Sequence, residues 1–136
     1  MTDQQVENQP PTPVEEMTYN VVPDVENGVY PAVCTAFELA HGKSRDTGED
    51  ESYYSWGFAV QVGDTTEDLR GSSSLFTSPG AKTTKWTVAL VGAARMKDRN
   101  VKLNPQEDIV GAACMVEVAA NDSGYPKVIN VMPPLR

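Results

Sequence analysis

Histidine and cysteine are scarce in this chain. Its 136 residues include one histidine, His41, and two cysteines, Cys34 and Cys114. These side chains are too few for the usual ligand set of a structural zinc site. His41 has no nucleophile–acid arrangement beside it, and the sequence contains neither a phosphate-binding loop nor a Gly-x-Ser-x-Gly turn. We therefore predict a protein that is not an enzyme and that has no metal and no cofactor.

Long apolar runs are also missing. No stretch approaches the roughly 18–20 apolar residues that a membrane-spanning helix needs. The first residues lack the basic and apolar regions of a secretory signal peptide. We expect a cytoplasmic protein with no membrane partner, in which Cys34 and Cys114 stay reduced in the core. A disulfide between them is the alternative, because their two strands would be neighbours in the fold predicted below.

Positive charge is absent from the first 28 residues. This segment has six acidic side chains and no Lys or Arg, so residues 29–136 carry only −2 of the chain's net charge of −8. Residues 1–18 are also polar, rich in proline and poor in aromatic side chains, a composition typical of disorder. We predict a disordered acidic tail over residues 1–18 and a single domain over residues 19–136.

The rest of the chain contains five strand-like runs and one amphipathic helix. Trp86, Ala89, Leu90, Ala93 and Met96 share one face of a helix expected over residues 82–97. Three strands, a helix and two strands follow one another in the order of the oligonucleotide/oligosaccharide-binding (OB) barrel, a partly open five-stranded barrel. We predict a mainly β, OB-like barrel with one helix between its third and fourth strands. The strands are expected at Val29–Leu39, Tyr53–Val62, Leu69–Phe76, Ala112–Ala120 and Pro126–Met132.

Side-chain alternation separates core aromatics from candidate binding aromatics. Tyr54, Trp56 and Phe58 share one strand face with two valines, so we assign that face to the core. Trp86 begins the apolar helix stripe and is assigned to the core as well. Aromatic side chains outside these faces are candidates for stacking on nucleic-acid bases. They are Tyr53, Phe76 and Tyr125.

Positive charge is concentrated in residues 82–102, which contain six Lys or Arg and one Asp. Such a cluster attracts phosphate, although a solvated helix with a basic end is the alternative interpretation. We predict a nucleic-acid groove over the second and third strands, between loops 41–52 and 119–125. The expected phosphate contacts are Lys43, Arg45, Arg70 and Lys127, with Lys82 and Lys85 as secondary contacts.

Three segments carry a family resemblance that covers roughly residues 20–134. They are Glu26-Asn-Gly-Val-Tyr-Pro-Ala-Val33, Tyr54-Ser-Trp-Gly-Phe-Ala-Val60, and the ending Ile109-Val-Gly-Ala-Ala-Cys-Met-Val-Glu-Val118 with Gly124-Tyr-Pro-Lys-Val-Ile-Asn-Val-Met-Pro133. They resemble small phage-encoded OB-fold proteins, similar to single-stranded-DNA-binding proteins, of replication and recombination modules. The resemblance implies a phage protein that binds single-stranded DNA during DNA replication or recombination in the host cytoplasm. Its implied partners are this DNA and phage or host replication and recombination proteins, and an exposed edge strand would allow homo-oligomers.

A second hypothesis belongs to another class of function. The excess of negative charge is also typical of a protein-interaction module. Such a module would be a virion component, or a host-factor inhibitor that uses its barrel and its acidic tail as a DNA mimic. The two hypotheses differ in the role that they give to residues 1–18.

Overall fold

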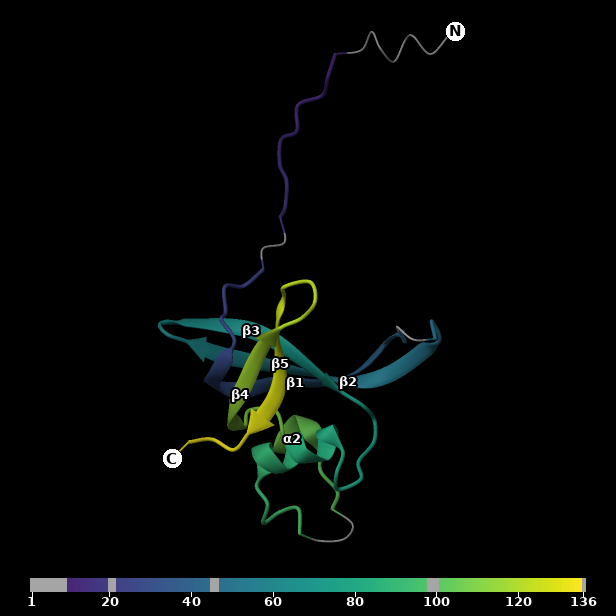
Figure 1. The fold of residues 1–136 in the computed structure, drawn as a ribbon, viewed down its shortest axis with the longest axis vertical. Coiled ribbons are helices and arrows are strands. Elements are labelled where there is room, and N and C mark those ends of the chain that lie inside the picture. Colours follow the sequence, from purple (N-terminus) through teal and green to yellow (C-terminus); the bar gives the residue numbers. More distant parts are fainter. Residues whose placement is uncertain (1–9, 20–21, 45–46, 98–100, 136) are drawn as a thin grey trace.

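The structure is a computed structural model, and it describes residues 10–19, 22–44, 47–97 and 101–135. Residues 10–19 have no regular secondary structure and extend away from the folded part (Figure 1). Among the described residues, no helix combines the length and the apolar character needed to cross a membrane. The elements are β1 (Gly28–Lys43), β2 (Asp50–Val62), β3 (Thr65–Ser73), α2 (Lys82–Val91), α3 (Pro105–Asp108), β4 (Ala113–Ala120) and β5 (Pro126–Met132).

The five strands form one antiparallel sheet in the order β3-β2-β1-β4-β5. The predicted order of the five strands, with a helix between the third and the fourth, is confirmed, as is the position of the fourth strand beside the first. A second, short helix lies between the same two strands. The sheet is open: within the described residues, β3 and β5 lie at its two ends without pairing.

Strand β1 is long and has two partners. Its first part, Gly28–Val33, pairs with β4, whereas residues from Ala32 to Lys43 pair with β2. The register with β2 shifts between Cys34 and Ala36, which is the bulge geometry that lets a strand bend. Beyond Leu39 and Tyr54, where the pairing of β2 with β3 ends, β1 and β2 continue as a two-stranded extension (Figure 1). Half of the loop predicted over residues 41–52 is therefore strand, because cross-strand pairs continue to Lys43 and Asp50.

The core occupies the face that the alternation predicted. Trp56, Phe58 and Val60 of β2 are fully buried, together with Leu69 of β3. Helix α2 lies at one end of the sheet (Figure 1) and inserts Trp86, whose ring centroid is 5.4 Å from that of Trp56. The assignment of both tryptophans to the core is confirmed.

Helix α2 is shorter than the sequence predicts. It ends at Val91, and Gly92 follows with a φ of 96°, a left-handed value that favours glycine. Its backbone N–H donates to the carbonyl of Val88 and closes the last turn. The apolar stripe therefore ends at Leu90, and Ala93 is exposed. The prediction of a helix to residue 97 was wrong because this glycine terminates the helix rather than weakening it.

The short helix α3 was not predicted. The side chain of Asn104 accepts a hydrogen bond of 3.0 Å from the backbone N–H of Gln106, and Pro105 occupies the first helical position. Asparagine before proline is a standard helix start. The helix has only four residues and no apolar periodicity, so periodicity in the sequence does not predict it.

Both thiols are free and buried. The backbone N–H of Cys34 donates to the carbonyl of Ala112, two residues before Cys114. Burial raises the pKa of Cys34 to about 11 and that of Cys114 to about 12. The structure therefore places both cysteines in the core as protonated thiols.

Candidate nucleic-acid interface

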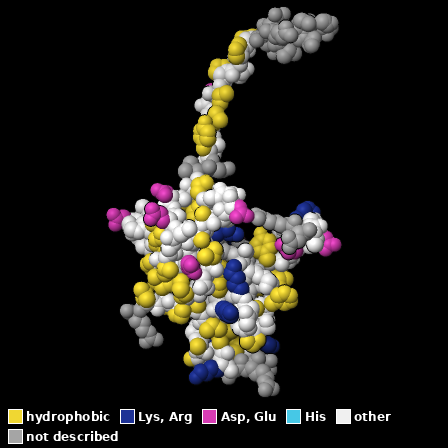
Figure 2. Space-filling view, in the orientation of Figure 1, with side chains coloured by type: hydrophobic (Ala, Val, Ile, Leu, Met, Phe, Trp, Pro, Cys, Tyr) yellow, Lys and Arg dark blue, Asp and Glu magenta, His cyan; other side chains and the backbone are white. Residues whose placement is uncertain are grey.

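A hollow of about 780 Å³ lies between the outer face of β2 and β3, helix α2 and strand β5. The position of the hollow follows from side-chain alternation. Along β2, Tyr53 and Ser55 alternate with Tyr54 and Trp56, whose side chains face the core, so Tyr53 and Ser55 point away from the core. Figure 2 shows Lys and Arg side chains in a column on this side of the molecule, running from the sheet toward the helix. The side chains that define the hollow are Tyr53, Ser55, Arg70, Ser72, Lys82 and Lys127.

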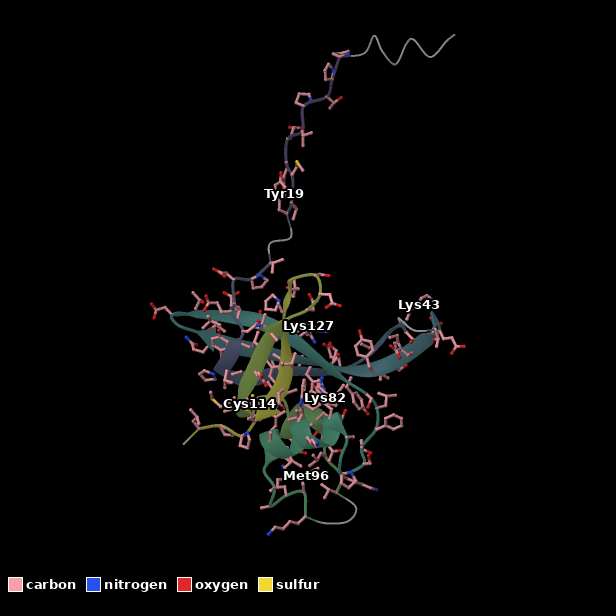
Figure 3. The ribbon with its side chains drawn as sticks, in the orientation of Figure 1. Tyr19, Lys43, Lys82, Met96, Cys114 and Lys127 are labelled. Atoms are coloured by element: carbon pink, nitrogen blue, oxygen red, sulfur yellow. The ribbon has the colours of Figure 1, made fainter. Side chains whose placement is uncertain are left out.

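Four of the predicted binding residues meet in this hollow. Tyr53 comes from β2, Arg70 from β3, Lys82 from the first turn of α2, and Lys127 from β5. Figure 3 labels Lys82 and Lys127 near the junction of helix and sheet. Residues from four separate elements thus form one surface that has three cationic side chains and one aromatic ring.

The remaining predicted residues lie elsewhere. Phe76 is 74% exposed in the loop after β3; since β3 ends at Ser73, Phe76 does not share a strand face with Arg70 as predicted. Tyr125 lies just before β5, and Lys85 is exposed on α2 without lining the hollow. Lys43 lies near the end of the β1–β2 extension (Figure 3), and its ammonium is 3.0 Å from the carboxylate of Asp50. Arg45 lies outside the described residues.

Arg70 already has an anionic partner. Its Nη1 donates to Oε1 of Glu38 at 2.8 Å and to the hydroxyl of Ser55 at 3.3 Å. All three side chains lie on the outer face of neighbouring strands, where the register places Glu38 opposite Ser55. The Glu38 carboxylate therefore neutralises much of the charge that Arg70 brings to the hollow.

Lys82 and Lys127 differ from Arg70. In the part of the chain that the structure describes, no carboxylate lies within ion-pair distance of either ammonium. The Nζ of Lys82 lies 4.7 Å from the centroid of the Trp86 ring, a cation–π contact. Partial desolvation, and then the positive charge of Lys127, lower the pKa of Lys82. The uncompensated charge of the hollow is therefore at these two lysines.

Sequence reasoning missed the polar lining of the hollow. Hydroxyl groups of Ser52, Ser55, Ser72 and Ser74 surround the cations, and Glu51 adds one carboxylate. Ser72 shares the outward parity of Arg70 on β3, and Ser74 follows directly after the end of that strand. Hydroxyl groups beside cations can hydrogen-bond to phosphate or sugar oxygens.

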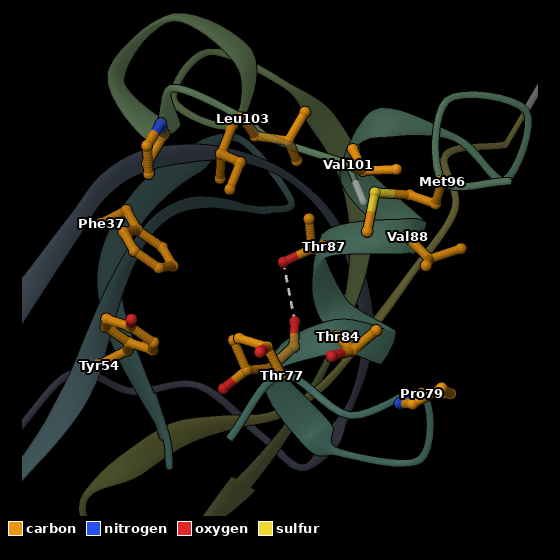
Figure 4. A pocket seen from close by; sticks show the side chains of 13 residues that line it. Phe37, Tyr54, Thr77, Pro79, Thr84, Thr87, Val88, Met96, Val101 and Leu103 are labelled. Carbon is orange, nitrogen blue, oxygen red and sulfur yellow. Dashed lines mark hydrogen bonds between the residues drawn. The ribbon is translucent and has the colours of Figure 1, made fainter. Parts of the chain in front are cut away.

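A second cavity, of about 600 Å³, has different chemistry (Figure 4). Phe37 and Tyr54 form one side, with ring centroids 4.7 Å apart, and α2 forms the other. No charged side chain among the described residues lines it. The hydroxyl of Thr84 is buried in its wall without a hydrogen-bond partner in the described part of the chain. The described lining offers no cation for a phosphate.

Comparisons with known proteins add no relative. No family model matches the sequence, and a search of curated proteins finds no significant match. Within the described residues, no group of His, Cys, Asp and Glu side chains is arranged to hold a metal ion. The functional argument therefore depends on the hollow itself.

Proposed function

We propose that this chain is a non-enzymatic single-stranded-DNA-binding protein of phage replication or recombination, acting in the host cytoplasm. One observation carries the proposal: Arg70, Lys82, Lys127 and Tyr53 come together in a single hollow on the outer face of the sheet. Cations contribute the sequence-independent part of nucleic-acid affinity, and an aromatic ring provides a platform for an unpaired base.

The proposed binding mode separates two contacts. The DNA backbone follows the lysines and the serine hydroxyl groups, and one base stacks on Tyr53. Each stack of this kind contributes about 1–3 kcal/mol, for any base, because every base has a π-face. Duplex DNA keeps its bases paired and offers none to Tyr53, so a preference for single strands follows from this mode.

The proposed fold is an OB-like barrel whose seam lies between β3 and β5. Gly71 of β3 lies close to β5 at this seam: a Cβ on this residue would lie 2.8 Å from the carbonyl oxygen of Val128. The two end strands of the sheet are thus near one another at the hollow, as a partly open barrel requires.

The test is fluorescence anisotropy of a labelled dT oligonucleotide of about 30 bases, titrated at low and moderate salt. We expect saturable binding that weakens steeply with salt and that excess duplex DNA competes for poorly. Absence of binding at low salt, or equal competition by duplex DNA, would contradict the proposal.

The acidic segment supports a second candidate, a protein-interaction module. Residues 10–28 contain four acidic side chains and no basic one. Within this segment Val14, Met17 and Tyr19 are 73%, 62% and 72% exposed, so apolar and acidic groups are presented together. Such a segment suits a basic partner with apolar pockets, and a virion protein or a host DNA-binding enzyme would provide one.

Deletion of residues 1–18 separates the two candidates. If the chain binds DNA through the hollow, the deletion leaves its DNA affinity unchanged or increases it, because negative charge is removed. If the chain is an acidic interaction module, the deletion abolishes capture of a phage or host protein that the full chain retains.

A further inference from the structure

We propose that Lys82 and Lys127 bind one and the same phosphate of the DNA backbone, which anchors the strand in the hollow. This inference rests on the proposed function and adds to it a defined phosphate site built from two elements. Arg70, the third cation of the hollow, has a different role because Glu38 already occupies its guanidinium.

The first argument is uncompensated charge. Both ammonium groups line one hollow, and neither has a carboxylate partner within the described residues. Desolvation by burial lowers the pKa of Lys82, and the nearby positive charge of Lys127 lowers it further. Two neighbouring like charges destabilise each other, and an anion between them removes that cost.

The second argument is fixed position. The Lys82 side chain lies over the ring of Trp86, which is 1% exposed and packs edge-on against Trp56 and Phe58. Lys127 is half-buried in β5 and pairs with Ala119 of β4. The cation–π contact holds the Lys82 ammonium, and strand pairing fixes the backbone from which the Lys127 side chain extends. The site is therefore partly ordered before DNA arrives, which reduces the ordering entropy lost on binding.

The third argument is contrast with the other cations. Lys43 and Arg95 each lie 3.0 Å from a carboxylate, and Arg70 lies 2.8 Å from one. Binding a phosphate at any of these three residues requires exchange of an existing partner. Lys82 and Lys127 need no such exchange, and among the described cations without a carboxylate partner they are the ones that line the hollow, so these lysines are the favoured place for the first phosphate.

The salt dependence of binding to a dT oligonucleotide of about 30 bases tests this site. For single-stranded nucleic acid, each neutralised phosphate contributes about −0.7 to the slope of log K against log salt. We would measure this slope for the wild-type chain, Lys82→Gln, Lys127→Gln and the double variant. If the lysines share one phosphate, the double variant loses about 0.7 of slope. If they hold separate phosphates, it loses about 1.4.

Lys102→Gln is the matched control, because Lys102 is exposed and does not line the hollow. It removes the same charge, and we expect it to leave the wild-type slope unchanged. Circular dichroism and a melting curve establish that each variant is folded; glutamine keeps two of the four methylene groups of lysine and a polar end.

The outcomes distinguish the two proposals. A wild-type chain that does not bind the oligonucleotide overturns both the proposed function and the shared site. If the wild-type chain binds but the slope of the double variant falls by about 1.4, or does not fall at all, only the proposal of a shared phosphate is overturned. Wild-type binding, a loss of about 0.7 in the double variant and an unchanged control support both.

Discussion

The indole N–H of Trp56 donates a hydrogen bond of 2.8 Å to the hydroxyl of Ser73. Both residues are buried, and the hydroxyl of Thr83 on α2 donates to the same oxygen at 2.6 Å. One serine therefore connects β2, β3 and the first turn of the helix. The same first turn bears Lys82, so this buried contact fixes the position of a cation in the hollow.

Replacing Ser73 with alanine should lower the free energy of unfolding by about 1–3 kcal/mol, because the buried indole N–H loses its acceptor. Urea denaturation of the wild type and the variant measures the difference. Ser72→Ala is the control, since Ser72 is half-buried on the outer face and its hydroxyl makes no hydrogen bond to the described residues. Equal stability of Ser73→Ala and the wild type would contradict the role given to this hydrogen bond.

Gly71→Ala should destabilise the fold for a steric reason. An added Cβ would lie 2.7 Å from Cη2 of Trp86 and 2.8 Å from the carbonyl oxygen of Val128. One contact is to a backbone atom and the other to a buried ring, so neither atom can move away without a cost in free energy. We expect a loss of about 1–3 kcal/mol, as for other overpacked sites, measured by the same denaturation.

Gly80→Ala is the matched control for this prediction. A Cβ at Gly80 meets nothing within 4 Å, and its backbone does not have a left-handed φ. We expect its stability to stay within about 0.5 kcal/mol of the wild type. Similar losses at the two glycines would contradict the proposed close approach of β3 to Trp86 and β5.

Part of this fold is readable from the sequence, because alternation is a local signal. Tyr54, Trp56 and Phe58 belong to the core face on parity alone, and the same parity places Tyr53 outside. Gly92 shows where local reading fails: a glycine at this spacing fits either a weakened helix or a helix end, and only its φ of 96° decides.

Only part of the hollow can be predicted from the sequence. Strand parity pairs Tyr53 with the outer face, but nothing local places Lys127 of β5 near Lys82 of α2. That proximity depends on how the helix packs through Trp86 against the sheet. Similarly, Arg70 is an obvious cation in the sequence, whereas its pairing with Glu38 depends on the register across three strands.

The two buried thiols predict a loss of stability at alkaline pH. The folded pKa values of about 11 for Cys34 and about 12 for Cys114 lie above the ordinary value of 9.0. Between pH 9 and these values the unfolded chain releases protons that the folded chain keeps. Stability is therefore fully present below about pH 9 and falls as the pH rises toward 11–12.

Denaturation between pH 8 and pH 11 checks this sign. A Cys34→Ala/Cys114→Ala variant should be less stable at pH 8, because the substitutions leave small cavities, but its stability should fall less steeply with pH. The variant is needed because lysine and tyrosine side chains titrate in the same range. Parallel pH curves for the two proteins would contradict burial of the thiols.

The ion pair between Arg70 and Glu38 predicts opposite effects of two substitutions on DNA binding. Glu38→Gln frees the guanidinium and removes a negative charge near the hollow, so single-strand affinity should rise about 1.5- to 5-fold, the scale of an exposed ion pair. Arg70→Glu should lower it, because it places two carboxylates where phosphate must approach. Anisotropy at low salt measures both, and an unchanged affinity of Arg70→Glu would exclude the hollow as the DNA site.

Tyr53→Leu tests the stacking contact apart from charge. Leucine keeps an apolar side chain next to Gly42, where an added Cβ would lie 3.4 Å from Cε1 of Tyr53. The substitution removes the aromatic face. A lost stack of about 1–3 kcal/mol corresponds to a decrease in affinity of about 5- to 150-fold, with little change in the salt slope.

Phe76→Leu is the comparison, since Phe76 is 74% exposed in the loop after β3 and lies outside the hollow. We expect a smaller loss there. If Phe76→Leu loses more affinity than Tyr53→Leu, the base stacks in the loop between β3 and α2, and the DNA path proposed over Tyr53 is wrong.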